Sequence, residues 1–347
     1  MTKPVLFERR GRAGWIVLNR PKALNALTHD MALAIDARLR AWAADDRIAA
    51  VVIEGAGDRA FCAGGDVRAL YHAMRTGDRR TTRDYYRDEY RLNRRIARYG
   101  KPYIALVDGV VMGGGVGVSI HGSHRVVGDR VVFAMPETGI GLFPDVGATF
   151  FLPRMPGALG LYVGLTGARL GAADSLYAGF ATHTVPSDRW GELRLSLADE
   201  TGSLEARLAR LATFAGPAPL AEHRAAIDRC FSGRALADVF GALERERSNW
   251  ARQTLATLAS KSSTSLAVTF RQIRLGASLD LESAIRLEYR LTQRFVEGWD
   301  FPEGVRAVVI DKDGQPRWRP AALADIDDAA IDALFAPMPE GDMTYED

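Results

Sequence analysis

The chain has 347 residues, of which 47% are hydrophobic and 25% charged, and this suits one large or two ordinary well-packed domains. Its 45 basic and 43 acidic residues leave a net charge of +2, so no whole-chain field favours nucleic acid or an anionic membrane. Two cysteines, Cys62 and Cys230, cannot form a disulfide framework, and we expect a cytoplasmic protein. The N-terminus lacks a continuous apolar segment and no later stretch reaches the ~18 apolar residues of a membrane span, so neither export nor insertion is expected.

Strand and helix patterns alternate in the first part of the chain. Residues 5–10 and 14–19 flank a turn and predict a β-hairpin, after which residues 28–45 predict a helix with Thr28 as its N-cap. Further strands are predicted at 48–57, at 101–110 and twice within 124–137, with a helix opened by glycines at 113–122. This alternation predicts an α/β core.

The pattern turns helical beyond about residue 200. Helical spacing of apolar residues recurs at 203–215, 221–231, 249–260, 265–278 and 281–298. We therefore expect two domains, residues 1–215 as the α/β core with the ligand site and residues 216–347 as a helical C-terminal region.

Two glycine-rich loops follow predicted strands and run into predicted helices. One contains Gly64, Gly65 and Asp66, and the other contains the run 113–115. A helix start presents unpaired N–H donors, and glycine lets another group approach the backbone closely. Neither loop matches the phosphate-binding pattern GxxxxGK[ST] or a clean GxGxxG, so two helix starts that hold one oxygen atom are the better interpretation.

Four segments together resemble one protein family. They are AFCAGGDVRALY, KPYIALVDGVVMGGGVG, FAMPETGIGLFPDVGATFFLPRMPG and GWDFPEGVRAVVIDKDGQPRW. They are similar to the enoyl-CoA hydratase/isomerase (crotonase) superfamily, and most similar to its 3-hydroxyisobutyryl-CoA hydrolase branch. The resemblance implies an α/β fold with a spiral core of ββα units and a helical C-terminal region, and acyl-CoA thioesters as substrates. It also implies that the backbone amides of Gly65 and Gly114 hold the thioester oxygen, as an oxyanion hole does.

Glu137 and Asp145 lie eight positions apart in an apolar, glycine-containing stretch. Hydratases of the family use two glutamates, one matching Glu137 and one matching Gly117, so the hydratase pair is broken in this chain. Glu and Asp at the spacing of Glu137 and Asp145 are typical of the hydrolase branch. The alternatives are an exposed strand-end position for Glu137 and a helix-capping role for Asp145. For Asp66 we expect the structural role.

Glu89 interrupts an apolar stripe on a predicted helix. Tyr85, Glu89, Leu92, Ile96 and Tyr99 follow at spacings of four, three, four and three, which places them on one helix face. A carboxylate that faces inward needs a partner, so a buried ion pair with an arginine is one interpretation. The other is a substrate contact, which the resemblance favours because the hydrolase branch has a substrate-binding glutamate at this position.

Other candidate residues are assigned to packing or surface roles. His121 and His124 lack an evident third metal ligand, and Ser119 does not sit in a complete GxSxG motif. Cys62 has no adjacent activating group. We therefore expect no metal site.

These observations predict hydrolysis of a 3-hydroxyacyl-CoA. Gly65 and Gly114 would hold the carbonyl oxygen, and Glu137 would act as general base or as nucleophile. Asp145 and Glu89 would bind the 3-hydroxyl or the attacking water. No cofactor is expected beyond the CoA of the substrate, no nucleic-acid or membrane partner is expected, and a homo-oligomer is possible. The alternatives are a hydratase or isomerase of broad specificity and a non-catalytic acyl-CoA-binding protein.

Overall fold

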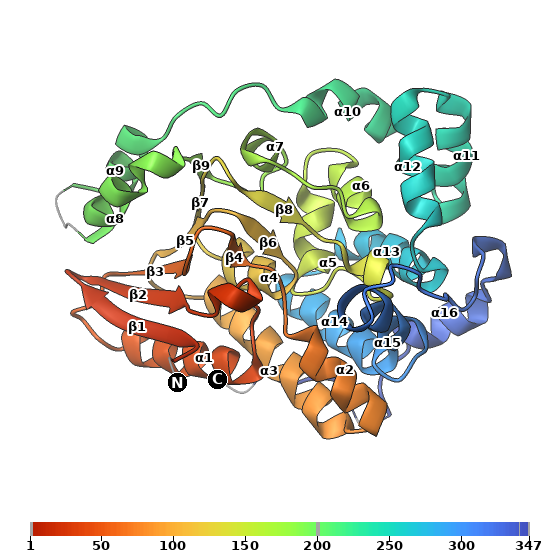
Figure 1. Ribbon diagram of the computed structural model, residues 1–347, viewed down its shortest axis with the longest axis horizontal. Helices are drawn as coiled ribbons and strands as arrows, with labels where there is room; N and C mark the ends of the chain where they lie inside the picture. The colour runs from red at the N-terminus through yellow and green to blue at the C-terminus, as the bar shows by residue number, and fades with distance from the viewer. Residues whose placement is uncertain (1–2, 199–201, 340, 346–347) are drawn as a thin grey trace. The chain divides into compact units, whose positions relative to one another are not determined.

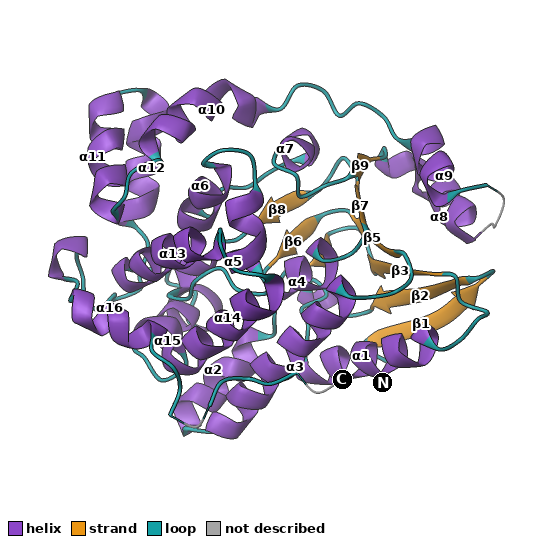
Figure 2. Ribbon diagram, turned by 180° about the vertical axis from the view of Figure 1, so that it is seen from behind, coloured by secondary structure: helices purple, strands orange, loops and turns teal. Residues whose placement is uncertain are grey.

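The protein is seen in a computed structural model that describes residues 3–198, 202–339 and 341–345. The chain divides into two compact units. The strand-containing unit comprises Met1–Gly65, Arg91–Ala134 and Arg169–Ala221, and the helical unit comprises Asp66–Tyr90, Met135–Ala168 and Glu222–Asp347. All strands found among the described residues, which are orange in Figure 2, belong by their sequence positions to the first unit. The expected domain boundary between residues 215 and 216 stays a prediction.

The strands form two sheets (Figure 1). Their bounds are β1 (Val5–Arg10), β2 (Ala13–Leu18), β3 (Ala50–Gly55), β4 (Ala60–Cys62), β5 (Tyr103–Val107), β6 (Val110–Met112), β7 (His124–Val127), β8 (Val132–Ala134) and β9 (His183–Thr184). The larger sheet has the order β1-β2-β3-β5-β7-β9, and the smaller has the order β4-β6-β8. Neighbouring strands are parallel except for the predicted hairpin of β1 and β2.

Strands that follow each other in sequence are shared between the two sheets in a repeating way. In each of the pairs β3–β4, β5–β6 and β7–β8, the first strand joins the larger sheet and the second joins the smaller one. Helices then return the chain to the next pair, which makes each repeat a ββα unit. The α/β spiral expected from the sequence is confirmed.

Among the described residues, five α-helices lie wholly in the strand-containing unit. They are α1 (His29–Ala43), α4 (Gly114–Ile120), α7 (Ala172–Tyr177), α8 (Trp190–Ala198) and α9 (Leu204–Leu211). Thr28 caps α1 as predicted, because its side chain accepts a hydrogen bond from the N–H of Met31. The core of this unit joins one face of the larger sheet, including Trp15 and Val52, to apolar side chains of α8 and α9.

The other α-helices of the described chain lie wholly or partly in the helical unit, together with the 3₁₀ helix η2. They are α2 (Val67–Thr76), η2 (Glu137–Ile140), α5 (Ala148–Phe151), α6 (Leu159–Thr166), α11 (Leu236–Glu246), α12 (Asn249–Ala259), α13 (Ser263–Gly276), α14 (Leu281–Phe295), α15 (Asp300–Val305) and α16 (Asp328–Phe335), with α3 (Arg79–Ala97) and α10 (Pro219–Cys230) running from one unit into the other. Asp66 caps α2, as expected for a structural residue. Helices α13 and α14 both pack on the short helix α5. No helix among the described residues is both long enough and apolar enough to span a bilayer.

Candidate active site

The two glycine loops follow the carboxyl ends of β4 and β6, two neighbouring strands of the smaller sheet. Strands β4 and β6 pair in parallel, so the segments that follow them emerge side by side. Gly115 approaches Cys62 so closely that a Cβ atom on it would lie 2.2 Å from the Cys62 carbonyl oxygen. A side chain at residue 115 would therefore force the two loops apart.

Gly114 lies at the start of α4, and Gly65 directly precedes Asp66, the N-cap of α2. Gly114 is the first residue of α4, so its N–H has no intrahelical acceptor. The Gly65 loop is held instead through its neighbour, because the N–H of Leu27 donates to the carbonyl oxygen of Gly64 at 2.9 Å. Within the described chain no backbone hydrogen bond outside regular elements uses the N–H of Gly65 or Gly114. Their role as an oxyanion hole stays a prediction.

The three carboxyl residues predicted from the sequence are all buried in the helical unit. Glu137 begins η2 and is 5% exposed, Asp145 lies on the loop before α5 and is 5% exposed, and Glu89 on α3 is 2% exposed. One oxygen of Glu137 (Oε2) and one of Glu89 (Oε1) have no hydrogen-bond partner among the described residues. Glu137 is thus not the exposed strand-end residue of the alternative interpretation, and Glu89 has no arginine partner in the described structure.

The charge of Asp145 affects the pKa of both glutamates. Burial raises the pKa of Asp145 to about 6, against the hydrogen bond from Tyr90, which lowers it. Burial, followed by the charge of Asp145, raises the pKa of both Glu137 and Glu89 well above the usual range. A hydrogen bond with Tyr85 opposes the pKa shift of Glu89, and the charge of Lys261 opposes that of Glu137. Close carboxylates disfavour each other's ionisation, which is the setting of a catalytic acid or base that works near neutral pH.

Tyr90 is a site residue that the sequence interpretation missed. Its side chain is fully buried, and its hydroxyl donates a hydrogen bond of 2.7 Å to Oδ2 of Asp145. The ring of Tyr86, one helical turn earlier, packs against it with the ring centroids 5.8 Å apart. This bond holds Oδ2 of Asp145 in place.

The helix-capping role considered for Asp145 belongs to Glu288 on α14. The carboxylate of Glu288 accepts hydrogen bonds of 2.7 Å from the N–H of Gly147 and 2.7 Å from the N–H of Thr149, at the start of α5. Val146, between Asp145 and this anchor, has φ of 55°, which is unfavourable for a β-branched residue. We conclude that Glu288 holds a strained turn that presents Asp145.

Ser119, Cys62 and His124, for which the sequence predicts packing or surface roles, all contact other groups of the protein. The hydroxyl of Ser119 is buried and donates to the carbonyl oxygens of Gly115 and Val116 within α4. Cys62 is buried, and its thiol contacts the carbonyl oxygen of Gly64 at 3.4 Å. The ring of His124 stacks on that of His183.

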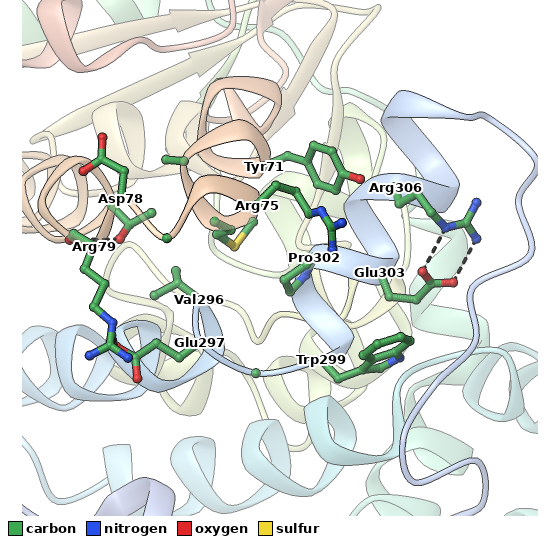
Figure 3. A pocket seen from close by; sticks show the side chains of 15 residues that line it. Tyr71, Arg75, Asp78, Arg79, Val296, Glu297, Trp299, Pro302, Glu303 and Arg306 are labelled. Carbon is green, nitrogen blue, oxygen red and sulfur yellow. Dashed lines mark hydrogen bonds and ion pairs between the residues drawn. The ribbon is translucent and has the colours of Figure 1, made fainter.

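The helical unit contains a cavity of about 540 Å³ (Figure 3). Tyr71 and Arg75 of α2 line it together with Trp299 and Pro302 near α15. Arg79 at its rim is paired with Glu297 at 3.0 Å. None of the carboxyl residues predicted from the sequence lines this cavity, so we do not identify it with the acid site.

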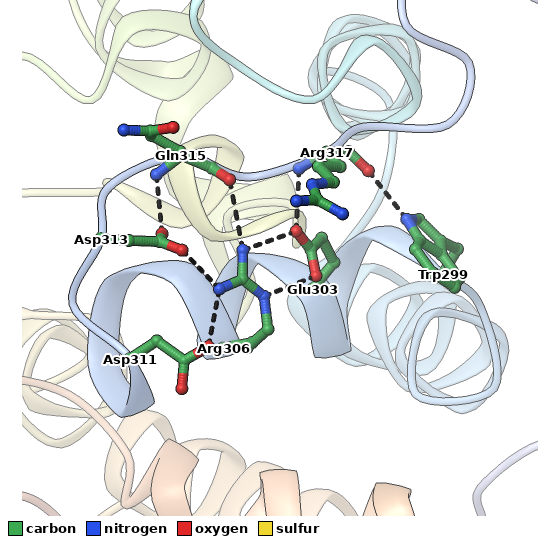
Figure 4. Close-up of polar contacts among 7 residues, drawn as sticks. All are labelled: Trp299, Glu303, Arg306, Asp311, Asp313, Gln315 and Arg317. Carbon is green, nitrogen blue, oxygen red and sulfur yellow. Dashed lines mark hydrogen bonds and ion pairs between the residues drawn. The ribbon is translucent and has the colours of Figure 1, made fainter.

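The late sequence motif from 298 to 318 has a structural explanation (Figure 4). The guanidinium of Arg306 binds Glu303 at 2.8 Å, Asp311 at 2.7 Å and Asp313 at 2.6 Å. The indole N–H of Trp299 donates to the carbonyl oxygen of Arg317. These contacts tie the loop after η5 (Arg306–Ile310) back onto α15.

Known proteins resemble the chain over nearly its whole length. A family model described as enoyl-CoA hydratase/isomerase matches residues 13–335. A mitochondrial 3-hydroxyisobutyryl-CoA hydrolase of Danio rerio is 45% identical over 98% of this chain and 91% of its own length. The expectation of a cytoplasmic protein is wrong by this comparison, because the relative's name places it in the mitochondrion. Two unpaired cysteines indicate a reducing compartment and do not distinguish one such compartment from another.

Two solved structures share the fold. A structure titled carnitinyl-CoA dehydratase from Mycobacterium thermoresistibile superimposes with a TM-score of 0.94 at 43% identity, over 99% of each chain. A structure titled enoyl-CoA hydratase from Rhodobacter sphaeroides has a TM-score of 0.92 at 42% identity, over 99% of this chain and 100% of its own. With the match of the family model over residues 13–335, these results show that the chain belongs to the enoyl-CoA hydratase/isomerase family.

Proposed function

We propose that the chain hydrolyses the thioester of 3-hydroxyisobutyryl-CoA, a step of valine catabolism, to 3-hydroxyisobutyrate and CoA. The observation that carries the proposal is the buried group of Glu89, Glu137 and Asp145, in which one oxygen of each glutamate has no partner. Buried polar atoms are almost always hydrogen-bonded, so unpaired carboxyl oxygens call for a ligand with donors. A hydroxyacyl group and a water molecule supply such donors. The name and the 45% identity of the D. rerio relative support this substrate.

In the proposed reaction Glu137 acts in its ionised form. As a base it takes a proton from water, whose oxygen attacks the thioester carbon; as a nucleophile its own oxygen attacks, and water then hydrolyses the anhydride. Either way the carbonyl oxygen gains negative charge, which we assign to the N–H groups of Gly65 and Gly114. On the base route the C–S bond of the tetrahedral intermediate then breaks, and the leaving CoA thiolate takes up the proton that Glu137 removed from water. On the nucleophile route the C–S bond breaks when the anhydride forms, and the thiolate takes up a proton from the water that then hydrolyses the anhydride and frees Glu137. The chemistry uses no metal or redox cofactor.

Asp145 and Glu89 are assigned to the 3-hydroxyl of the acyl group. Tyr90 occupies one oxygen of Asp145, while Oε1 of Glu89 has no partner among the described residues. A substrate without the hydroxyl would leave these buried acceptors unpaired, and such sites reject the analogue strongly. We therefore expect discrimination against simple acyl-CoAs.

A hydratase is the second candidate, because two solved structures at 42% and 43% identity have hydratase or dehydratase titles. The hydratase mechanism implied by the family resemblance uses a second glutamate where this chain has Gly117. Gly117 is buried within α4 and supplies no side chain. The absence of that carboxylate at residue 117 favours hydrolysis over hydration.

A panel of acyl-CoAs tests the proposal. The purified protein is incubated with 3-hydroxyisobutyryl-CoA, isobutyryl-CoA and an unsaturated acyl-CoA, and thiol release is followed separately from loss of the conjugated double bond. We expect thiol release from the hydroxylated substrate at a kcat/KM at least about 100-fold above that for isobutyryl-CoA. Hydration of the unsaturated substrate without thiol release from the hydroxylated one would reject the proposal in favour of the hydratase.

A further inference from the structure

Lys261 is an unusual residue in this chain. Only Lys3, Lys22, Lys101, Lys261 and Lys312 are lysines among the 45 basic residues. Lys261 is half-buried and directly precedes Ser262, the N-cap of α13. Within the part of the chain that the structure describes, its ammonium has no hydrogen bond and no carboxylate within ion-pairing distance. A cation in such a position has a cost in desolvation that some other interaction must offset.

The backbone fixes Lys261 against η2. The N–H of Ser262 donates to the carbonyl oxygen of Thr138 at 3.2 Å, and the hydroxyl of Ser262 donates to Asp300 at 2.5 Å. The lysine Nζ lies 3.2 Å from the point where a Cβ atom on Gly139 would stand. Glycine at residue 139 thus leaves the room that the ammonium occupies, two residues from Glu137.

We propose that Lys261 is a positioning residue that keeps Glu137 ionised for thioester hydrolysis. The inference rests on the proposed role of Glu137. A compact ammonium at this place favours a charged carboxylate without forming the direct ion pair that would occupy its oxygens. The unpaired oxygen of Glu137 therefore remains open to water or to the thioester.

A second charged group, Asp145, acts on Glu137 in the opposite direction. Asp145 faces it from the loop before α5, and its charge raises the pKa of Glu137, whereas the charge of Lys261 lowers it. Tyr86 faces the acids from α3, and Glu89 and Glu288 are coupled to the site through Asp145. In return, the charge of Glu137 supports the pKa of Lys261, which burial lowers. Among the groups that act on Glu137 in the described structure, Lys261 is the positive one.

The test is the pH dependence of kcat/KM for 3-hydroxyisobutyryl-CoA hydrolysis. Activity requires ionised Glu137, so it rises with pH through the pKa of this group. Removing the positive charge with Lys261→Met raises that pKa, and we expect the acid limb to move to higher pH by about one unit. Lys261→Arg keeps the charge and should keep the limb within a few tenths of a unit of the wild type. Lys312→Met, at an exposed lysine of the same unit, should not move the limb.

A lysine that only binds CoA or only supports folding gives different results. In the first case Lys261→Met raises KM at every pH and leaves the acid limb in place, and in the second it lowers the amount of folded protein without a limb shift. Either result overturns the inference. If Lys261→Met folds poorly, a ¹³C NMR titration of labelled glutamate carboxyls in Lys261→Gln and wild-type protein, with Glu137→Gln to assign the signal, measures the pKa of Glu137 directly, and an unchanged pKa in Lys261→Gln overturns the inference. Full activity of Glu137→Gln would reject the role of Glu137 itself, while an inactive Glu137→Gln with an unmoved limb in Lys261→Met rejects only the role of Lys261.

Discussion

Replacing Asp145 by asparagine should stabilise the protein while it impairs hydrolysis. The carboxyl of Asp145 is buried, and burial raises its pKa from 3.8 to about 6. An acid whose pKa is higher in the folded than in the unfolded state weakens folding once it ionises. Asparagine has nearly the same shape, still accepts a hydrogen bond from Tyr90 and carries no charge.

The pH dependence follows from the two pKa values. Below pH 3.8 the carboxyl is protonated in both states, and the charge has no effect on stability. As the pH rises to about 6, the unfolded chain ionises first, so the free energy of unfolding falls with each unit of pH. Above that pH both states are ionised and the full cost remains. A shift of about two units at 1.36 kcal/mol each gives about 3 kcal/mol.

Urea unfolding of the wild type and Asp145→Asn at about pH 4 and about pH 8 measures this difference. We expect the variant to gain about 2–3 kcal/mol relative to the wild type between the two pH values. Tryptophan fluorescence reports the transition, and thiol release should fall at least about 100-fold in the same variant. A difference between the two proteins that does not change with pH would refute the account of Asp145 as a destabilising buried charge.

Three further substitutions test the supports of the site. Glu288→Ala leaves the N–H groups of Gly147 and Thr149 without their acceptor, so we expect a loss of about 2–4 kcal/mol in urea unfolding, and a loss below about 0.5 kcal/mol would contradict the anchoring role. Tyr90→Phe removes the hydrogen bond to Asp145 and raises the pKa of that acid further; unfolding free energy should drop by about 1.5–3 kcal/mol at pH 8 and by less at pH 4, and equal losses would exclude a bond to the charged form. Gly115→Ala places a Cβ atom 2.2 Å from a backbone oxygen, so thiol release should fall at least about tenfold. Gly171→Ala, where nothing lies within 4 Å, is its control, and equal behaviour of the two would remove the steric argument.

Local patterns were sufficient to predict most elements. The hairpin, the strands β3, β5, β7 and β8 and the helix capped by Thr28 all follow from spacing, breakers and caps. The inward stripe on α3 holds from Tyr85 to Ile96, which are buried, and stops there because the helix ends at Ala97, before Tyr99. These features depend on neighbours in sequence, which is why sequence alone carries them.

The contacts that hold Asp145 depend on residues distant in sequence. Tyr90 lies 55 residues before Asp145, and Glu288 lies 141 residues beyond Gly147. No local rule connects such pairs. Glu288 did leave a signal, however, because Ala284, Glu288, Leu291 and Phe295 form a stripe at spacings of four, three and four. The reasoning applied to Glu89 would have identified this second inward carboxylate.

Lys261 left a weaker signal. Lysine is rare in a chain that otherwise uses arginine, but rarity alone does not tell which of the five lysines approaches an acid. That information comes from the segment before α13, which the Ser262 to Thr138 hydrogen bond places beside η2. An interaction between charges that are distant in sequence can be predicted only when the fold is known.

The most direct test of the central claim is the turnover of Glu137→Gln with 3-hydroxyisobutyryl-CoA. Glutamine keeps the size of the side chain but neither takes a proton from water nor attacks a thioester. We expect kcat to fall at least about 1,000-fold, with the Kd of a non-hydrolysable CoA thioether changed less than about threefold. Glu244→Gln, at an exposed glutamate on α11, is the matched control and should retain full activity. Turnover of Glu137→Gln within a few-fold of the wild type would contradict the account.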